Sequence, residues 1–130
     1  MIVHPALDGI PPDPRVLARL YRREQRISDK GNPVIPVNLP AGDPLRLAFS
    51  LTLFGQPPEA MRDYWDQMYF HGISPPKVLG SQEAVLRFVA GTPGAIGYVA
   101  DCRVGDGVRV LLRLQLPDAT SLPGCEGGDR

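Results

Sequence analysis

The stretch SQEAVLRFVAGTPGAIGYV, Ser81 to Val99, predicts a helix, a turn and a buried strand in immediate succession. The Ser81 hydroxyl can accept a hydrogen bond from a main-chain amide two or three residues later and so begin the helix. Gly91 offers a left-handed stop, and Pro93 prevents the helix from continuing. Ala95 to Val99 is short, apolar and bounded by turn residues, which favours an interior strand.

Two features of this stretch predict how it packs. One is an apolar stripe at helical spacing, formed by Ala84, Val85, Phe88 and Val89. The other is Gly97 within the strand, where a missing side chain indicates close approach by another backbone or by a ligand. The stretch therefore predicts a helix that packs against a sheet.

The composition limits the class of protein. A chain of 130 residues is about one domain, and its 43% hydrophobic and 22% charged residues are typical of a soluble globular protein. Fourteen basic and 14 acidic residues balance, which gives no electrostatic reason to expect nucleic acid as a partner. No apolar run approaches the ~20 residues of a transmembrane helix. The first residues also lack the basic start and apolar centre of a signal peptide.

The rest of the chain alternates predicted strands with predicted helices. The expected strands are Ile2–Val3, Val34–Leu39 and Val108–Leu116, and the expected helices run from about Asp13 to Glu24, Asp43 to Gly55 and Pro58 to Phe70. This alternation predicts an open α/β sheet in one domain over residues 1–116, followed by a flexible C-terminal tail over residues 117–130. Pro36 removes one main-chain donor, so its strand is expected at a sheet edge or at a bulge.

The helix expected over Pro58–Phe70 has the clearest amphipathic pattern in the chain. Its apolar positions are Met61, Tyr64, Trp65, Met68 and Tyr69. A stripe of this kind is more often part of a core than a platform for a ligand, so we expect it to be buried.

The two cysteines are Cys102 and Cys125. A bridge between them would contribute about 3 kcal/mol to stability in the chain-entropy model. The alternative is two independent thiols, and the sequence leaves both interpretations open. Two cysteines and two histidines at scattered positions do not have the spacing of zinc ligands, so no metal or cofactor is expected.

The junctions between strands and helices are the candidate binding positions. In open α/β sheets, ligands bind where a strand leads into a helix N-terminus, whose free amides suit a small anion. Two junctions qualify, the one that enters the helix at Asp43 and the one that approaches Ser81. Arg46, in the first turn after Asp43, would add a forked donor for an oxyanion. The expected anion-binding residues are Gly42, Asp43, Leu45, Arg46 and Ser81.

Two motifs resemble the phosphate ABC transporter substrate-binding proteins, which have the type 2 periplasmic binding protein fold. The first is GTPGAIGYV, Gly91 to Val99, together with the helix before it. The second is AGDPLRLAFS, Ala41 to Ser50, whose Gly42 to Arg46 stand where the family has a loop rich in glycine and hydroxyl residues. The resemblance covers one lobe, nearly from Val3 to Leu114. It implies a three-layer domain with a short mixed sheet flanked by helices, a role in phosphate import and a periplasmic location.

The chain departs from the family's pattern at the anion loop itself. Asp43 and Leu45 replace two hydroxyl residues, and Pro44 removes an amide donor. The Asp43 carboxylate can accept hydrogen bonds from the helix amides, and its charge repels a phosphate dianion. Two interpretations follow: an anion bound at Gly42–Arg46, or a helix capped by its own side chain that needs no ligand.

The catalytic motifs are absent from the sequence. It has no P-loop, dinucleotide fingerprint, HExxH or nucleophile elbow, so we do not expect an enzyme. By resemblance, we expect a non-catalytic solute-binding-protein-like domain with a degenerate anion site, whose ligand would be phosphate or another small oxyanion. The alternative is a one-lobed interaction or accessory module with no solute, whose partner would be a membrane or envelope protein.

Overall fold

A five-stranded mixed sheet organises the fold in the computed structural model, which describes residues 1–115. The strands are β1 (Ile2–Val3), β2 (Ile35–Asn38), β3 (Lys77–Val78), β4 (Ala95–Gly97) and β5 (Arg109–Val110), in the spatial order β3-β2-β4-β1-β5. β2 runs parallel to β3 and β4, whereas β1 is antiparallel to β4 and β5. The predicted tail over residues 117–130 lies outside the described residues, as does Leu116.

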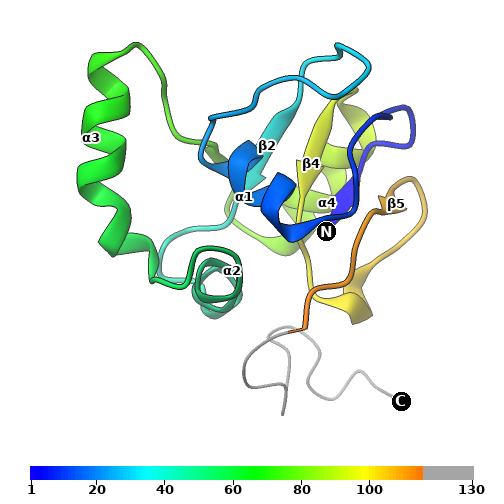
Figure 1. The fold of residues 1–130 in the computed structure, drawn as a ribbon. Coiled ribbons are helices and arrows are strands. Elements are labelled where there is room, and N and C mark those ends of the chain that lie inside the picture. The colour runs from blue at the N-terminus through cyan, green and yellow to red at the C-terminus, as the bar shows by residue number, and fades with distance from the viewer. Residues whose placement is uncertain (116–130) are drawn as a thin grey trace.

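Helices cover both faces of this sheet. They are α1 (Pro14–Tyr21), α2 (Pro44–Phe54), α3 (Arg62–Phe70) and α4 (Gln82–Gly91), with the 3-10 helices η1 (Pro58–Met61) and η2 (Asp101–Arg103). Figure 1 shows α1 in front of the sheet and α4 behind it. The expected three-layer α/β class is therefore confirmed. Within residues 1–115, no helix is both long and apolar enough to cross a bilayer.

Three helices begin where local side chains predict. Asp13 and Asp43 each accept a hydrogen bond from the amide two residues later, at 2.9 and 2.8 Å. The Ser81 hydroxyl accepts one from the amide of Ala84 at 3.1 Å. A proline occupies the first turn of both α1 and α2, where no partner exists for an amide hydrogen. Gly55, at a φ of +73°, ends α2 as predicted.

The stretch from Ser81 to Val99 folds as helix, turn and strand, but the expected left-handed stop at Gly91 is wrong. Gly91 is the last residue of α4, and the left-handed backbone lies at Gly94, where φ is +89°. A Cβ atom on Gly94 would also stand 2.6 Å from the carbonyl oxygen of Pro33. The turn into β4 therefore needs glycine both for its backbone angle and for the space.

Gly97 marks a close approach by side chains rather than by a backbone or a ligand. A Cβ atom at this position would lie 2.7 Å from Val85 Cγ1 and 3.0 Å from Val37 Cγ2. Val85 belongs to α4 and is buried, as is Val89 one turn later. The missing side chain therefore lets α4 lie directly against β4.

Pro36 lies in an interior strand, contrary to its expected position at a sheet edge. It pairs with Ile96 of β4, whereas β3 pairs only with Val37 and Asn38 further along. The Ile35 amide donates toward β4, so the nitrogen of Pro36 faces the opposite side, where β3 has not yet begun. The proline consequently removes no hydrogen bond from the sheet.

Two other expected elements are shorter than predicted. α1 ends at Tyr21 rather than Glu24, and Arg23 after it has a φ of +64°. In the final strand, only Arg109 and Val110 pair with β1. The largest fully buried side chains lie in the sheet, just after β2, and on α1. They include Tyr21, Ile2, Leu17, Leu20, Leu39 and Ile96.

The expected burial of the aromatic stripe holds only in part, because Met61 is buried, Tyr64, Trp65 and Met68 are partly buried, and Tyr69 is exposed. α3, all of whose residues are described, contains no buried residue, and Figure 1 shows it standing away from the sheet. Tyr69 and Phe70 are 71% and 85% exposed. Only Met61, in η1 before the helix, is buried, and the Tyr64 hydroxyl donates to the Arg22 carbonyl at 2.7 Å. The periodicity predicts an apolar face, but it does not predict that this chain supplies a partner for that face.

The contact at Gly97 can be tested with two alanine substitutions. Gly97→Ala is expected to lower the free energy of unfolding by about 1–3 kcal/mol, because α4 must move away from β4. Gly105→Ala is the control, since its Cβ atom would meet nothing within 4 Å. Urea denaturation measures both, and equal stability of the two variants would contradict the packing described.

Candidate functional site

The carboxyl ends of three parallel strands meet at one edge of the sheet, which we call the carboxyl edge. β2, β3 and β4 all run in the same direction and end there. α2 begins shortly after β2, and α4 begins shortly after β3. Both predicted junctions therefore open onto the carboxyl edge, where ligands of open α/β sheets usually bind.

The loop at the first junction satisfies its own helix. Asp43 accepts a hydrogen bond from the Leu45 amide, so its carboxylate occupies the place where an anion would contact the start of α2. The Leu45 side chain is buried. Gly42 is exposed, and a Cβ atom on it would meet nothing within 4 Å. No close approach requires glycine at that position.

The two remaining predicted residues also bond within the chain. Arg46 Nη1 donates to the carbonyl oxygen of Leu39 at 3.1 Å, so the guanidinium covers the end of β2. Ser81 is exposed and its hydroxyl caps α4 through the amide of Ala84. The groups that the sequence offers to an oxyanion thus have partners in the protein itself.

A polar cluster that the sequence did not predict lies at the centre of the carboxyl edge. The Tyr98 hydroxyl donates to Oδ1 of Asn38, and the amide of Leu39 donates to both, at 3.3 and 3.1 Å. Burial raises the pKa of the Tyr98 hydroxyl above its usual range, so the phenol stays protonated and remains a donor. The local sequence signal for this cluster was Asn38, a polar residue at the end of the buried strand β2.

The ring of Tyr98 joins this cluster to α2. It stacks on Phe49 with centroids 3.8 Å apart and planes 8° from parallel. Phe49 also meets the ring of Tyr21 edge-on, at 5.0 Å. The Tyr21 hydroxyl donates to the carbonyl of Val37 at 2.8 Å. Three aromatic rings therefore hold α1, α2 and the ends of β2 and β4 together.

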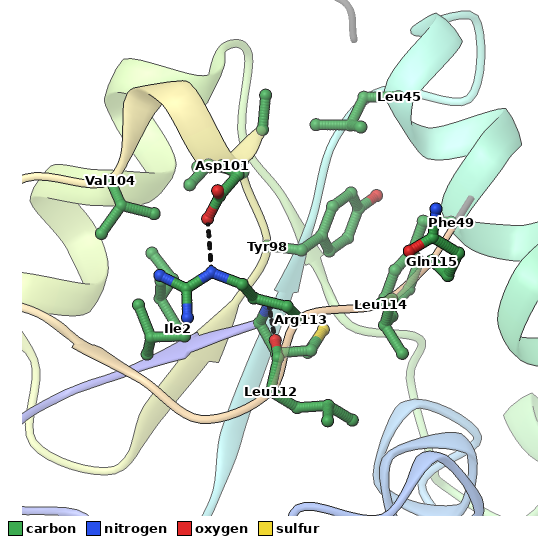
Figure 2. Close-up of a pocket in the computed structure, with 14 residues that line it drawn as sticks. Ile2, Leu45, Phe49, Tyr98, Asp101, Val104, Leu112, Arg113, Leu114 and Gln115 are labelled. Carbon is green, nitrogen blue, oxygen red and sulfur yellow. Dashed lines mark hydrogen bonds and ion pairs between the residues drawn. The ribbon is translucent and has the colours of Figure 1, made fainter. Parts of the chain in front are cut away.

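Two hollows adjoin these rings, and each is lined by one of the predicted anion-binding residues. The smaller, about 210 Å³, is lined by Arg46, Asn38, Ser50 and Trp65 among others. The larger, about 270 Å³, has Leu45 in its wall and is drawn in Figure 2. Within the described part of the chain, Gly42, Asp43 and Ser81 line neither hollow. The five predicted residues therefore do not converge on one cavity.

The larger hollow is mostly apolar, and we call it the apolar pocket. Its walls include Ile2, Leu45, Phe49, Val104, Leu112 and Leu114. Figure 2 shows the Asp101–Arg113 ion pair at its rim, where Arg113 Nε lies 2.9 Å from Asp101 Oδ1. Both partners are more than half exposed, so the pair contributes little to stability. Among residues 1–115, no group of three or more His, Cys, Asp or Glu side chains could hold a metal ion.

The amino group of Met1 is buried beside this pocket. It donates to the carbonyl oxygen of Leu112 at 2.8 Å. Burial lowers the pKa of the amine from 8.0 to about 6, and the nearby Asp101 carboxylate partly opposes that change. The neutral amine is therefore favoured in the folded protein near neutral pH.

This burial predicts how the stability of a chain that begins at Met1 depends on pH. Below pH 8 the unfolded chain binds a proton that the folded protein does not bind until about pH 6. The contribution to stability is therefore complete above pH 8 and is lost as the pH falls to 6, by about 2–3 kcal/mol. Urea denaturation across this range measures it. A chain acetylated at Met1 is the control, and identical pH dependence of the two chains would contradict the burial.

The comparisons with known proteins add no family. A scan against protein-family models gives no match, and a search of curated proteins gives none either.

Proposed function

We propose that this chain is a non-catalytic binding domain of substrate-binding-protein-like form, whose oxyanion site is degenerate and whose partner is another protein of the cell envelope. The observation that carries the proposal is that three donors at the carboxyl edge, the amides of Leu45 and Ala84 and the Arg46 guanidinium, bond within the protein. The Asp43 carboxylate accepts a hydrogen bond from the Leu45 amide, and the Ser81 hydroxyl accepts one from the first turn of α4. The Arg46 guanidinium donates to a main-chain carbonyl. A solute would have to displace these contacts before it could bind.

Charge adds a second reason against a phosphate ligand. The Asp43 carboxylate lies at the start of α2, where the helix dipole favours a negative charge. A phosphate dianion about 4 Å from it would be repelled by several kcal/mol at the effective dielectric of a protein surface. The carboxylate and the anion therefore compete for the same position.

The exposed apolar residues support a protein partner. Tyr69 and Phe70 on α3 are largely exposed, and Leu47 and Leu51 on α2 are 43% and 39% exposed. Aromatic side chains are enriched in protein interfaces, because they bury a large apolar area on contact. Tyr64, Trp65 and Met68 of α3 are partly buried, so it is the end of the helix at Tyr69 and Phe70 that is available to a second molecule.

The alternative is a solute-binding domain for phosphate import in the periplasm. One observation favours it: Arg46 and Asn38 both line the smaller hollow, which gives that cavity a cationic and a polar wall. In this alternative the Arg46 guanidinium would leave the Leu39 carbonyl and bind the oxyanion.

Isothermal titration with phosphate, sulfate and molybdate distinguishes the two functions. We expect no saturable heat from the natural sequence at micromolar ligand, because the donors are occupied. Asp43→Ser keeps a capping hydroxyl and removes the charge, so this variant is expected to bind phosphate more tightly than the natural sequence. Saturable heat from the natural sequence that Arg46→Ala abolishes would contradict the proposal and support the solute-binding alternative.

A matched pair of phenylalanine substitutions tests whether the face of α3 serves the fold. Phe70→Ala is expected to change the free energy of unfolding by less than about 0.5 kcal/mol, since its side chain is exposed. Phe49→Ala should lower the same quantity by about 3–5 kcal/mol, because Phe49 is buried in the aromatic cluster. Thermal or urea denaturation measures both. A comparable loss for Phe70→Ala would mean that α3 packs on the domain and has no face to offer a partner.

A further inference from the structure

The smaller hollow is lined mostly by aromatic and proline side chains. Its walls come from α2, from η1 and α3, and from the segment that leads into β3. The aromatic side chains are Tyr21, Phe49, Phe54 and Trp65. An apolar cavity of about 150 Å³ holds benzene, so a hollow of about 210 Å³ admits a larger planar ring system. Aromatic rings also favour contact with other rings beyond the area that they bury. The walls therefore suit an aromatic molecule.

A buried asparagine in this hollow has a donor group without an acceptor. Asn38 is 8% exposed, and its Oδ1 atom accepts from the Leu39 amide, which fixes which atom of the side-chain amide is the oxygen. Within residues 1–115, the Nδ2 group donates to no protein atom, yet Nδ2 is not sealed from solvent. Because Asn38 lines the smaller hollow, its amide hydrogens are available to an acceptor placed there.

The hollow also carries positive charge. Among the described residues that line it, Arg46 is the one with a charged side chain, and none is acidic. Arg46 Nη1 donates to the Leu39 carbonyl, which leaves the other N–H groups of the guanidinium for a ligand. The planar guanidinium matches the two oxygens of a carboxylate. A phosphate dianion would bring a second charge and could gain nothing from the aromatic walls.

We propose that the smaller hollow binds a small aromatic carboxylate. The ring system packs beside Phe54 and Trp65, and the carboxylate accepts hydrogen bonds from Asn38 Nδ2 and from the Arg46 guanidinium. Arg46 keeps its bond to Leu39, and the capped amides that begin α2 and α4 keep their partners. This binding is therefore separate from the degenerate oxyanion site and from the protein partner proposed for the end of α3.

Two resonances report on the hollow in a nuclear magnetic resonance titration with 2-naphthoate. Trp65 is the one tryptophan of the sequence, so its indole N–H gives a single signal, and Asn32 is the one other asparagine. At constant pH and ionic strength, the Trp65 indole and Asn38 Nδ2 signals should shift saturably, with a Kd below about 1 mM. The side-chain signal of Asn32, which is exposed, should not move. Signals of Trp65 and Asn38 that stay in place would overturn the proposal and leave the degenerate oxyanion site unaffected.

Two analogues separate the contribution of the charge from that of the rings. 2-Naphthalenemethanol lacks the carboxylate and should bind at least about tenfold more weakly than 2-naphthoate. Decahydro-2-naphthoate keeps the carboxylate without the aromatic rings and should bind at least about threefold more weakly. Equal affinity for the alcohol would overturn the role of Asn38 and Arg46. Equal affinity for the saturated acid would overturn the role of the aromatic walls.

Variants assign the carboxylate to its two donors. Arg46→Met keeps an apolar stem without the guanidinium and should weaken 2-naphthoate binding at least about tenfold. Arg19→Met is the control, because Arg19 is an exposed arginine of α1 that lines neither hollow, and its affinity should change less than about twofold. Asn38→Asp keeps the acceptor for the Leu39 amide and replaces the donor with a charge, so it should abolish binding. If Asn38→Asp does not fold, Trp65→Leu takes its place and should weaken binding at least about threefold. Wild-type affinity in Arg46→Met, or in the folded second variant, would overturn the assignment.

Discussion

The side chain of Tyr98 connects the sheet to the helix that begins at its carboxyl edge. Its hydroxyl donates to Asn38 and accepts from the amide of Leu39, while its ring stacks on Phe49 of α2. A buried polar group without a partner is costly, so the phenol and the amide side chain require each other. This pair fixes the end of β2 against the end of β4, and the stacked ring fixes α2 over both.

Several polar groups at the carboxyl edge therefore bond to other groups of the protein. Tyr98 and Asn38 bond to one another, and the Leu39 carbonyl accepts from Arg46. The start of α2 is satisfied by Asp43 in turn. A helix N-terminus in an α/β protein normally offers its amides to a ligand, and here the chain supplies the anion itself. The donors of Leu45 and Arg46 at this edge therefore stabilise the fold.

The sequence predicts those parts of the structure that depend on neighbouring residues. The caps at Asp13, Asp43 and Ser81 and the buried strand at Ala95–Gly97 are local signals, and all are confirmed. The contact between Tyr98 and Asn38 joins residues 60 positions apart, and no local pattern encodes it.

Two other predictions failed for the same reason, because they depend on contacts between segments far apart in the sequence. The apolar face of α3 has the right period for burial, but burial depends on whether another element lies opposite. Pro36 can lie in an interior strand because β3 pairs only with Val37 and Asn38 and does not extend to Pro36. The register of the sheet shows this, and the local sequence does not. At the candidate site, the residue types at Gly42–Arg46 indicate both an anion and a self-capped helix, and the structure adds the hydrogen bond from the Leu45 amide to Asp43.

The most direct test of the closed carboxyl edge is a nuclear magnetic resonance titration that observes the amides of Leu39, Leu45 and Ala84. These three amides donate to side chains of the protein in the structure. In millimolar phosphate, at constant ionic strength and pH, we expect that their resonances do not move. Saturable shifts of these amides, with the Arg46 guanidinium resonance moving in parallel, would show that the edge opens to a solute and would contradict the account.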